Sequence, residues 1–432
     1  MSNSGLIGEL QQIVGSRNVI TNPKSMERFC KGYRSGEGKA VAVVRPGTLV
    51  EQWRIIQACV AHDMIIIMQA ANTGLTEGST PSGTYDRDVV ILSTTRMDQI
   101  QMLRDGRQII SFPGATLFAL EKLLAPLKRQ PHSVIGSSCI GASIIGGVCN
   151  NSGGSLVERG PSYTELSLYA QITEDGRVEV INHLGIDLGD DPETILTRLE
   201  AGDYTEADVQ DSNLKASDTD YHRRVRDVDA DSPARYNADT RRLYEASGCA
   251  GKLAVFAARL DTYPQNNQEQ VFYLGTNDTA VLTELRRHVL KEFKNLPVSG
   301  EYMHADAYDI TKHFGKDTLV MIDKLGTDRL PRIFALKGWL DARLNKLPLL
   351  PKNLTDRFMQ GLMKLWPNPL PDRMEAFRER FEHHLILKMR DEGIAETEAY
   401  LSETFDGTTS DWFACTPREA KIAGLHRFAA AG

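Results

Sequence analysis

Two glycine-rich segments, each preceded by a predicted strand, constrain the fold of this chain more than any other feature. The first, Met68–Ser79, follows an apolar run and is built almost entirely from small or hydroxylated residues, and the second spans residues 136–154. A backbone without bulky side chains approaches a ligand closely, and glycine permits turns that point successive N–H groups at one anion. We interpret the pair as one cofactor site that holds a pyrophosphate from both sides. Alternatively, such loops serve only to turn the chain.

Neither segment carries a common nucleotide-binding signature. No G-x-G-x-x-G opens a helix after the first strand, and residues 141–147 and 248–252 both lack the full G-x-x-x-x-G-K-[ST] pattern. The paired arrangement, with Asn150-Asn151-Ser152-Gly153-Gly154 closing the second segment, instead favours a flavin.

A resemblance to a known family rests on several strings in a fixed order along the chain. Val43–Thr48, Asn72–Ser79, Ile145–Gly154 and Ser247–Leu253 resemble the FAD-binding domain of the vanillyl-alcohol-oxidase superfamily, known as the PCMH type. More narrowly, the longer strings Gln69–Thr80, Pro131–Ser143 and Glu301–His304 look like the family of bacterial respiratory, quinone-dependent D-lactate dehydrogenases.

The resemblance implies a cofactor and the residues that hold it. Residues 64–100 contain no histidine, and several relatives attach FAD covalently through a histidine in this loop, so we expect FAD to be bound non-covalently. The residues implied to hold it are Ala70, Ala71, Asn72, Thr73, Gly74, Gly78, Ser79, Gly136, Ser143, Gly153 and Val255.

The fold class that we expect is α+β. Alternating helices and strands with hairpins up to about residue 260 predict a PCMH-type FAD-binding domain (1–260) of two α/β subdomains. The capping box Thr48-x-x-Glu51 starts a helix whose buried face carries Leu49, Trp53, Ile56 and Val60. Residues 261–432 read as strand–helix–strand units interrupted by an insertion, which fits a ferredoxin-like cap domain.

That insertion, residues 323–373, is basic and amphipathic. Between residues 329 and 366 eight lysines and arginines face only two aspartates, interleaved with leucine and tryptophan, although the whole chain has a formal net charge of −7. We expect it to dock on an anionic membrane surface without spanning the bilayer, because cations are attracted to anionic lipid and tryptophan favours the headgroup boundary. The alternative is a solvated basic loop. The acidic net charge and the aliphatic character of the block argue against nucleic acid.

Further expectations follow from the resemblance and the composition. A membrane-bound acceptor implies ubiquinone or menaquinone and a peripheral position on the cytoplasmic face of the bacterial inner membrane. No secretory signal is visible, and the six cysteines form no C-x-x-C pair, which favours a reducing compartment. Cys139, Cys149 and Cys249 lie within the apparent flavin loops, where a small side chain is the simplest explanation.

Oxidation of D-lactate or a similar 2-hydroxy acid requires a cation for the carboxylate and a base for the hydroxyl proton. Arg427 is implied by the resemblance as the cation, because a guanidinium matches a carboxylate bidentately. His304, His383, His384 and His426 are the candidate bases, of which His304 and His384 are preferred. Each has a plain alternative, namely an exposed arginine near a helix end or a structural histidine. His383 and His384 should point to opposite faces of a strand, and no metal site is expected.

The family continues past the position of Gly432 into a histidine-rich segment. We therefore expect a fragment with little lactate oxidation of its own, or a degenerate relative. Alternative functions are another FAD-linked 2-hydroxy-acid oxidoreductase and a non-catalytic FAD- and membrane-binding module.

Overall fold

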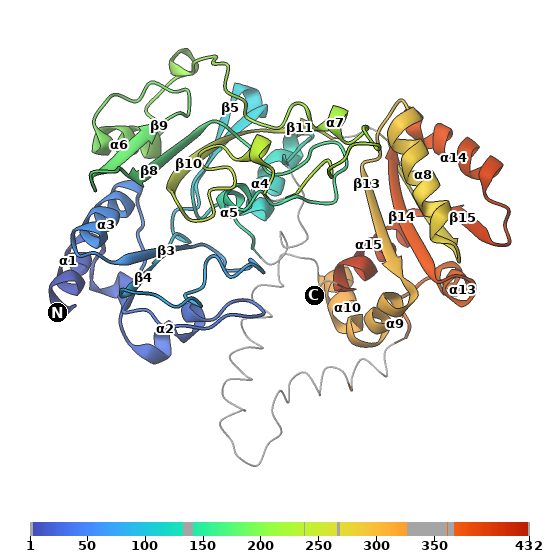
Figure 1. Ribbon diagram of the computed structural model, residues 1–432, viewed down its shortest axis with the longest axis horizontal. Coiled ribbons are helices and arrows are strands. Elements are labelled where there is room, and N and C mark those ends of the chain that lie inside the picture. The colour runs from blue at the N-terminus through green and yellow to red at the C-terminus, as the bar shows by residue number, and fades with distance from the viewer. Residues whose placement is uncertain are drawn as a thin grey trace. The chain divides into compact units, whose positions relative to one another are not determined.

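The computed structural model describes residues 3–132, 141–236, 238–265, 268–325, 361 and 367–430. The chain divides into two compact units (Figure 1). Unit 1 comprises residues 1–153, 160–219 and 235–265, and unit 2 comprises residues 154–159, 220–234 and 266–432. Two short segments of the predicted FAD domain thus pack with unit 2, and the boundary after residue 260 stays a prediction. Of the basic insertion, residues 326–360 and 362–366 lie outside the described residues.

The first subdomain of unit 1 is a four-stranded sheet in the order β1-β2-β4-β3. Strand β2 and strand β3 both pair with β4 in parallel, as expected for strands joined by helical crossovers. Its elements are α1 (Ser4–Val14), β1 (Val19–Ile20), α2 (Pro23–Cys30), β2 (Ala42–Val44), α3 (Leu49–Ala61), β3 (Ile65–Gln69) and β4 (Val89–Ser93).

Helix α3 tests the predicted capping box in detail. The backbone N–H of Glu51 donates to the Thr48 hydroxyl at 3.0 Å, as predicted. The Glu51 carboxylate, however, accepts from the N–H of Gly47 instead of that of Thr48, so the reciprocal bond of the box is shifted by one residue. On the predicted face Leu49, Trp53 and Ile56 are buried, whereas Val60 is half-buried.

The second subdomain is an antiparallel five-stranded sheet in the order β5-β6-β10-β8-β9. A bulge between Val255 and Ala257 interrupts the register of β10 against β8. Its elements are β5 (Ile100–Leu103), β6 (Gln108–Ser111), α4 (Leu117–Leu124), β7 (Arg129–Gln130), α5 (Ile144–Cys149), β8 (Ser167–Ile172), β9 (Val178–Asn182), α6 (Pro192–Ala201), β10 (Ala254–Asp261) and β11 (Tyr263–Pro264).

Unit 2 is built on an antiparallel sheet in the order β13-β14-β12-β15. Counted along the chain this is the strand order of a ferredoxin-like fold, which confirms the predicted cap. The elements are α7 (Tyr221–Arg224), β12 (Glu269–Thr276), α8 (Thr279–Glu292), β13 (Ser299–His304), α9 (Ala305–Phe314), α10 (Lys316–Leu325), α13 (Asp372–Arg380), β14 (His383–Arg390), α14 (Glu392–Thr404), β15 (Ser410–Ala414) and α15 (Pro417–Ala430).

The two faces of this sheet are covered by different helices (Figure 1). Helices α8 and α14 pack on one face through a core that includes Leu285, Val289 and Leu401. The other face carries α9, α10, α13 and α15, whose core includes Tyr308, Phe377 and Ile422. Among the described residues, the segment between β13 and β14 contributes α9, α10 and α13 to the second face, and the basic insertion follows α10 in the chain.

Candidate flavin and substrate sites

The first glycine-rich loop begins where β3 ends and is closed by side-chain hydrogen bonds. The Gln69 amide donates to the carbonyls of Phe29 at 2.9 Å and of Ser79 at 2.6 Å. The Asn72 side-chain oxygen accepts from the hydroxyls of Ser79 at 2.7 Å and Thr80 at 3.1 Å. Asn72 itself has a φ of 53°, a left-handed conformation that asparagine tolerates better than most residues. These bonds fix the base of the loop and leave its tip to the small residues.

The tip of the loop offers bare backbone. Gly74 and Gly78 are exposed, and a Cβ added at Gly74 would meet nothing within 4 Å. Ala70, Ala71 and Thr73 contribute only small side chains to the stretch that leads to Gly74. The space left open there by the protein is what a pyrophosphate needs, so the residues fit the FAD predicted from the sequence.

The second glycine-rich loop meets the first. A Cβ on Gly141 would lie 3.9 Å from the Cβ of Ala71, which is van der Waals contact. Gly141 has a φ of 93°, and Ser143 then caps α5 by accepting from the N–H of Gly146 at 3.1 Å. Gly136 lies outside the described residues. The two segments predicted to form one site are therefore adjacent in unit 1.

Residues 94–115 connect the two loops in sequence and are hydrogen-bonded to residues beside both of them. Thr94 donates its N–H to the carbonyl of Gln69 at 2.8 Å and its hydroxyl to that of Pro113 at 3.2 Å. Further along, Ile144 donates to the carbonyl of Ala115 at 3.0 Å. A Cβ at Gly114 would approach the Thr94 carbonyl to 2.3 Å, so only glycine fits there.

Two of the predicted FAD contacts have structural roles of their own. At Gly153 a Cβ would stand 2.2 Å from a guanidinium nitrogen of Arg235, so a larger residue would first disturb Arg235 rather than a pyrophosphate. Val255 is buried in the core, and its carbonyl accepts from the Gln52 amide at 3.2 Å. Direct contact of either residue with FAD stays a prediction.

Arg427, the predicted carboxylate ligand, is paired within unit 2. Its Nε lies 2.6 Å from Oε2 of Glu301, with side-chain exposures of 37% and 22%. Arg427 comes from α15 and Glu301 from β13, so this pair depends on tertiary packing. The contact through Nε fixes one edge of the guanidinium.

His304 and His384 lie on opposite faces of the sheet. His304 pairs across the strands with His383, and the Tyr302 hydroxyl lies 2.9 Å from Nδ1 of His383. His304 also caps α9, because its Nδ1 accepts from the N–H of Asp306 at 3.1 Å. The opposite orientation of His383 and His384 is confirmed, since His383 is half-buried and His384 is fully buried.

His384 is enclosed by aromatic rings instead of facing a site. Its ring centroid lies 5.6 Å from that of Tyr273 and 5.7 Å from that of Tyr308. Burial lowers its pKa from 6.5 to about 4, so the ring is neutral at physiological pH. The structure does not bring His384 and His304 together, and the burial of His384 argues against direct contact with a substrate.

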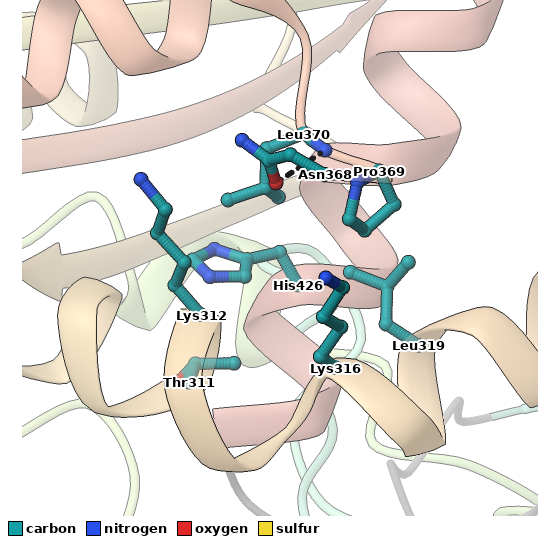
Figure 2. Close-up of a pocket in the computed structure, with 8 residues that line it drawn as sticks. All are labelled: Thr311, Lys312, Lys316, Leu319, Asn368, Pro369, Leu370 and His426. Carbon is teal, nitrogen blue, oxygen red and sulfur yellow. Dashed lines mark hydrogen bonds between the residues drawn. The ribbon is translucent and has the colours of Figure 1, made fainter. Parts of the chain in front are cut away.

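His426 lines the small cavity drawn in Figure 2. The ring is almost fully buried, its Nε2 has no hydrogen-bond partner, and burial lowers its pKa to about 4. Lys312 and Leu370 flank it in the close-up, and Lys312 is ion-paired with Glu375.

Within the described residues no group of three or more potential metal ligands occurs, and no helix is long and apolar enough to cross a membrane.

The fold and the paired loops define a PCMH-type FAD-binding protein with a cap, and comparisons with known proteins agree. The family described as FAD binding domain matches residues 40–182, and that described as D-lactate dehydrogenase, membrane binding, matches residues 271–432. Substrate-bound p-cresol methylhydroxylase is similar in structure, with a TM-score of 0.57 at 11% identity over 99% of this chain and 71% of that one.

Proteins with similar sequences show which family of FAD-binding proteins includes this chain. Quinone-dependent D-lactate dehydrogenase of Escherichia coli is 57% identical over 100% of this chain and 76% of its own length. The Haemophilus influenzae protein of the same name is 54% identical over 100% of this chain and 77% of its own length. The chain belongs to the family of quinone-dependent D-lactate dehydrogenases, and unit 2 carries that family's membrane-binding domain.

Proposed function

We propose that the enzyme to which this chain belongs oxidises D-lactate to pyruvate with FAD and passes the electrons to a membrane quinone. The observation that carries the proposal is the close approach of the two glycine-rich loops, in a chain that belongs to this family. FAD held there would supply the hydride acceptor for the reaction, and the protein supplies binding and orientation. The quinone is ubiquinone or menaquinone.

The cofactor is held by the residues around the open backbone of unit 1. Ala70–Gly74, Gly78 and Ser79 supply a main chain with no side chain in the way. Ser143 and the segment that follows approach from the other side. The Asn72 side-chain amide donates to the Lys31 carbonyl, and its oxygen accepts from two hydroxyls. Asn72 therefore shapes the loop, and backbone N–H groups bind the ligand. FAD is non-covalent in this proposal.

Arg427 binds the substrate carboxylate in this proposal. Glu301 engages Nε, so that the guanidinium is oriented by the cap before substrate arrives. An arginine positioned in this way loses less freedom on binding than a mobile one. His304, half-buried at the end of β13, is the proposed base for the hydroxyl proton, and its Nε2 is the nitrogen left for that role because Nδ1 caps α9.

The proposed membrane surface is anionic and lies on the cytoplasmic face of the bacterial inner membrane. Helix α10 carries the exposed Lys324 next to the basic segment, and a quinone acceptor is confined to lipid. On the neighbouring helix α9, Ile310 and Phe314 stand one turn apart with exposures of 59% and 66%. Apolar side chains of this kind add burial at the headgroup boundary to the electrostatic attraction.

Reduction of the bound flavin under anaerobic conditions tests the activity in the active enzyme. D-lactate is expected to bleach the flavin absorbance, whereas L-lactate, glycolate and D-2-hydroxyglutarate leave it largely oxidised. Bleaching by another hydroxy acid in preference to D-lactate would reassign the substrate, and bleaching by none would favour a non-catalytic FAD- and membrane-binding module. Acid precipitation should release all flavin into the supernatant.

Sedimentation with liposomes tests the membrane surface. Binding should rise with the fraction of anionic lipid, fall with salt, and weaken when Arg332, Lys337, Arg343 and Lys346 are neutralised together. Equal binding to neutral and anionic vesicles would contradict the electrostatic part of the proposal.

A further inference from the structure

Two cysteines meet beside the second glycine-rich loop. Cys149 is the last residue of α5, and Cys249 lies in the turn that precedes β10. Backbone hydrogen bonds hold the two segments together, from Gly248 N–H to the Val148 carbonyl at 3.0 Å and from Ala250 N–H to the Cys149 carbonyl at 3.3 Å. The two thiols are in hydrogen-bonding contact. Cys249 is buried and Cys149 is partly exposed.

The turn around Cys249 is shaped to hold an anion. Gly248, Ala250 and Gly251 have φ values of 68°, 49° and 84°, all in the left-handed region. In this turn the N–H of Cys249 donates to the Ala246 carbonyl at 3.3 Å, and the N–H of Lys252 donates to the Cys249 carbonyl at 3.0 Å. The N–H groups of Gly251 and Leu253 lie near the Cys249 sulfur and favour its negatively charged form.

The environments of the two sulfurs shift their pKa values in opposite directions. The hydrogen bond from Cys149 and then the backbone N–H groups lower the pKa of Cys249, against the opposing effect of burial. The pKa of Cys149 is raised by the same contact with Cys249 and by burial. Since the thiolate is the reactive species, Cys249 is the nucleophile and Cys149 is the thiol that resolves its oxidised form.

The remaining described cysteines lack this arrangement. Burial raises the pKa of Cys59 and of Cys415 to about 12 and also raises that of Cys30. A thiol with a raised pKa forms little thiolate and therefore reacts slowly with oxidants. The reactive chemistry is thus confined, among the described cysteines, to the pair at the second loop.

We propose that Cys249 and Cys149 are a peroxide-oxidisable pair that forms a reversible disulfide. The Cys249 thiolate attacks one oxygen of hydrogen peroxide, the O–O bond breaks, and hydroxide leaves, which gives a sulfenic acid on Cys249. The Cys149 sulfur then displaces hydroxide from that sulfenic acid, and its proton joins the leaving group as water. Two electrons pass from the two sulfurs to peroxide, and a dithiol restores the pair.

The disulfide would connect α5 to the turn before β10. Helix α5 starts at the capping residue Ser143, so the new bond would tie the far end of the second glycine-rich loop to a strand of the antiparallel sheet. The oxidation itself does not depend on the proposed function.

Peptide mass spectrometry of the folded flavoprotein tests the pair. After brief treatment with hydrogen peroxide and alkylation of remaining thiols, we expect a Cys149–Cys249 cross-linked peptide that disappears with dithiothreitol. Cys149→Ser should stop at a sulfenic acid on Cys249 that dimedone traps, whereas Cys249→Ser should give neither product. Cys415→Ser serves as the matched control and should behave as wild type.

Other oxidation products, or none, would contradict the proposal. A cross-link from either cysteine to Cys139, or oxidation of Cys30, Cys59 or Cys415 before Cys249, would remove the assignment. So would the absence of any disulfide in wild type under conditions in which free cysteine is oxidised. As a second measurement, the rate of alkylation of Cys249 against pH should have its midpoint below that of a free thiol, and Cys149→Ala should raise that midpoint.

Discussion

Two buried histidines should make the stability of unit 2 fall with acid. His384 and His426 are almost fully buried, and burial lowers each pKa from 6.5 to about 4. In the unfolded chain both rings take up protons below pH 6.5. The unfolded state therefore binds more protons than the folded state between pH 4 and 6.5, and stability decreases as the pH falls through that window.

The magnitude is large enough to measure. A pKa of about 4 in place of 6.5 corresponds to about 3 kcal/mol per ring once the pH is below both values. At pH 5 only part of this is lost, about 2 kcal/mol per ring and about 4 kcal/mol for the two. A domain is stable by only about 5–15 kcal/mol, so this loss is a substantial fraction.

The assay is urea unfolding at pH 8 and pH 5, followed by tryptophan fluorescence, for wild type and for the double variant His384→Leu/His426→Leu. The variant will be less stable at pH 8, but we expect its pH dependence to be smaller by about 4 kcal/mol. Carboxylates such as Asp323, whose pKa is lowered by Arg418 and Lys421, contribute equally to both proteins and cancel. His62→Leu, on the surface of unit 1, is the control. Identical pH dependence in wild type and the double variant would refute the reasoning.

Three further predictions concern the proposed sites. Gly74→Leu should weaken FAD binding at least ~10-fold without loss of stability, whereas Gly8→Leu, where an added Cβ also meets nothing within 4 Å, should retain the yellow spectrum. Arg427→Ala in the active enzyme should lower kcat/KM for D-lactate roughly 10- to 150-fold, which corresponds to a loss of about 1.5–3 kcal/mol of transition-state stabilisation. Unchanged kinetics would exclude the carboxylate role. Ile310→Ser with Phe314→Ser should reduce the liposome binding that remains at high salt, whereas Ile172→Ser, equally exposed in unit 1, should not; equal loss in both would sink the apolar anchor.

Local rules predicted much of the fold because each depends on residues that are close in sequence. Helix α15 begins with a capping box of Thr416 and Glu419, two residues three positions apart, and the structure has both of its bonds. Opposite orientations of His383 and His384 follow from strand geometry alone. The shift of the Glu51 contact to Gly47 was not predictable, because it depends on the angle at which the chain enters α3.

The candidate site was predicted unevenly for the same reason. The glycine-rich loops are recognisable by their composition, and the close approach of Ala71 and Gly141 agrees with the pairing inferred from the sequence. The pair of Arg427 with Glu301 and the reactive environment of Cys249 left no signal in the sequence. Each requires two segments far apart in the chain to meet.

The sequence alone determined the class of cofactor loop, the order of strands and helices, and the family, because these are written in short strings and in periodicity. Only the tertiary structure decided that His384 is enclosed between two tyrosine rings, that a guanidinium fills the space beside Gly153, and that Cys149 stands next to Cys249. Burial, pairing and pKa are properties of a residue's neighbours, and packing chooses those neighbours from distant parts of the chain.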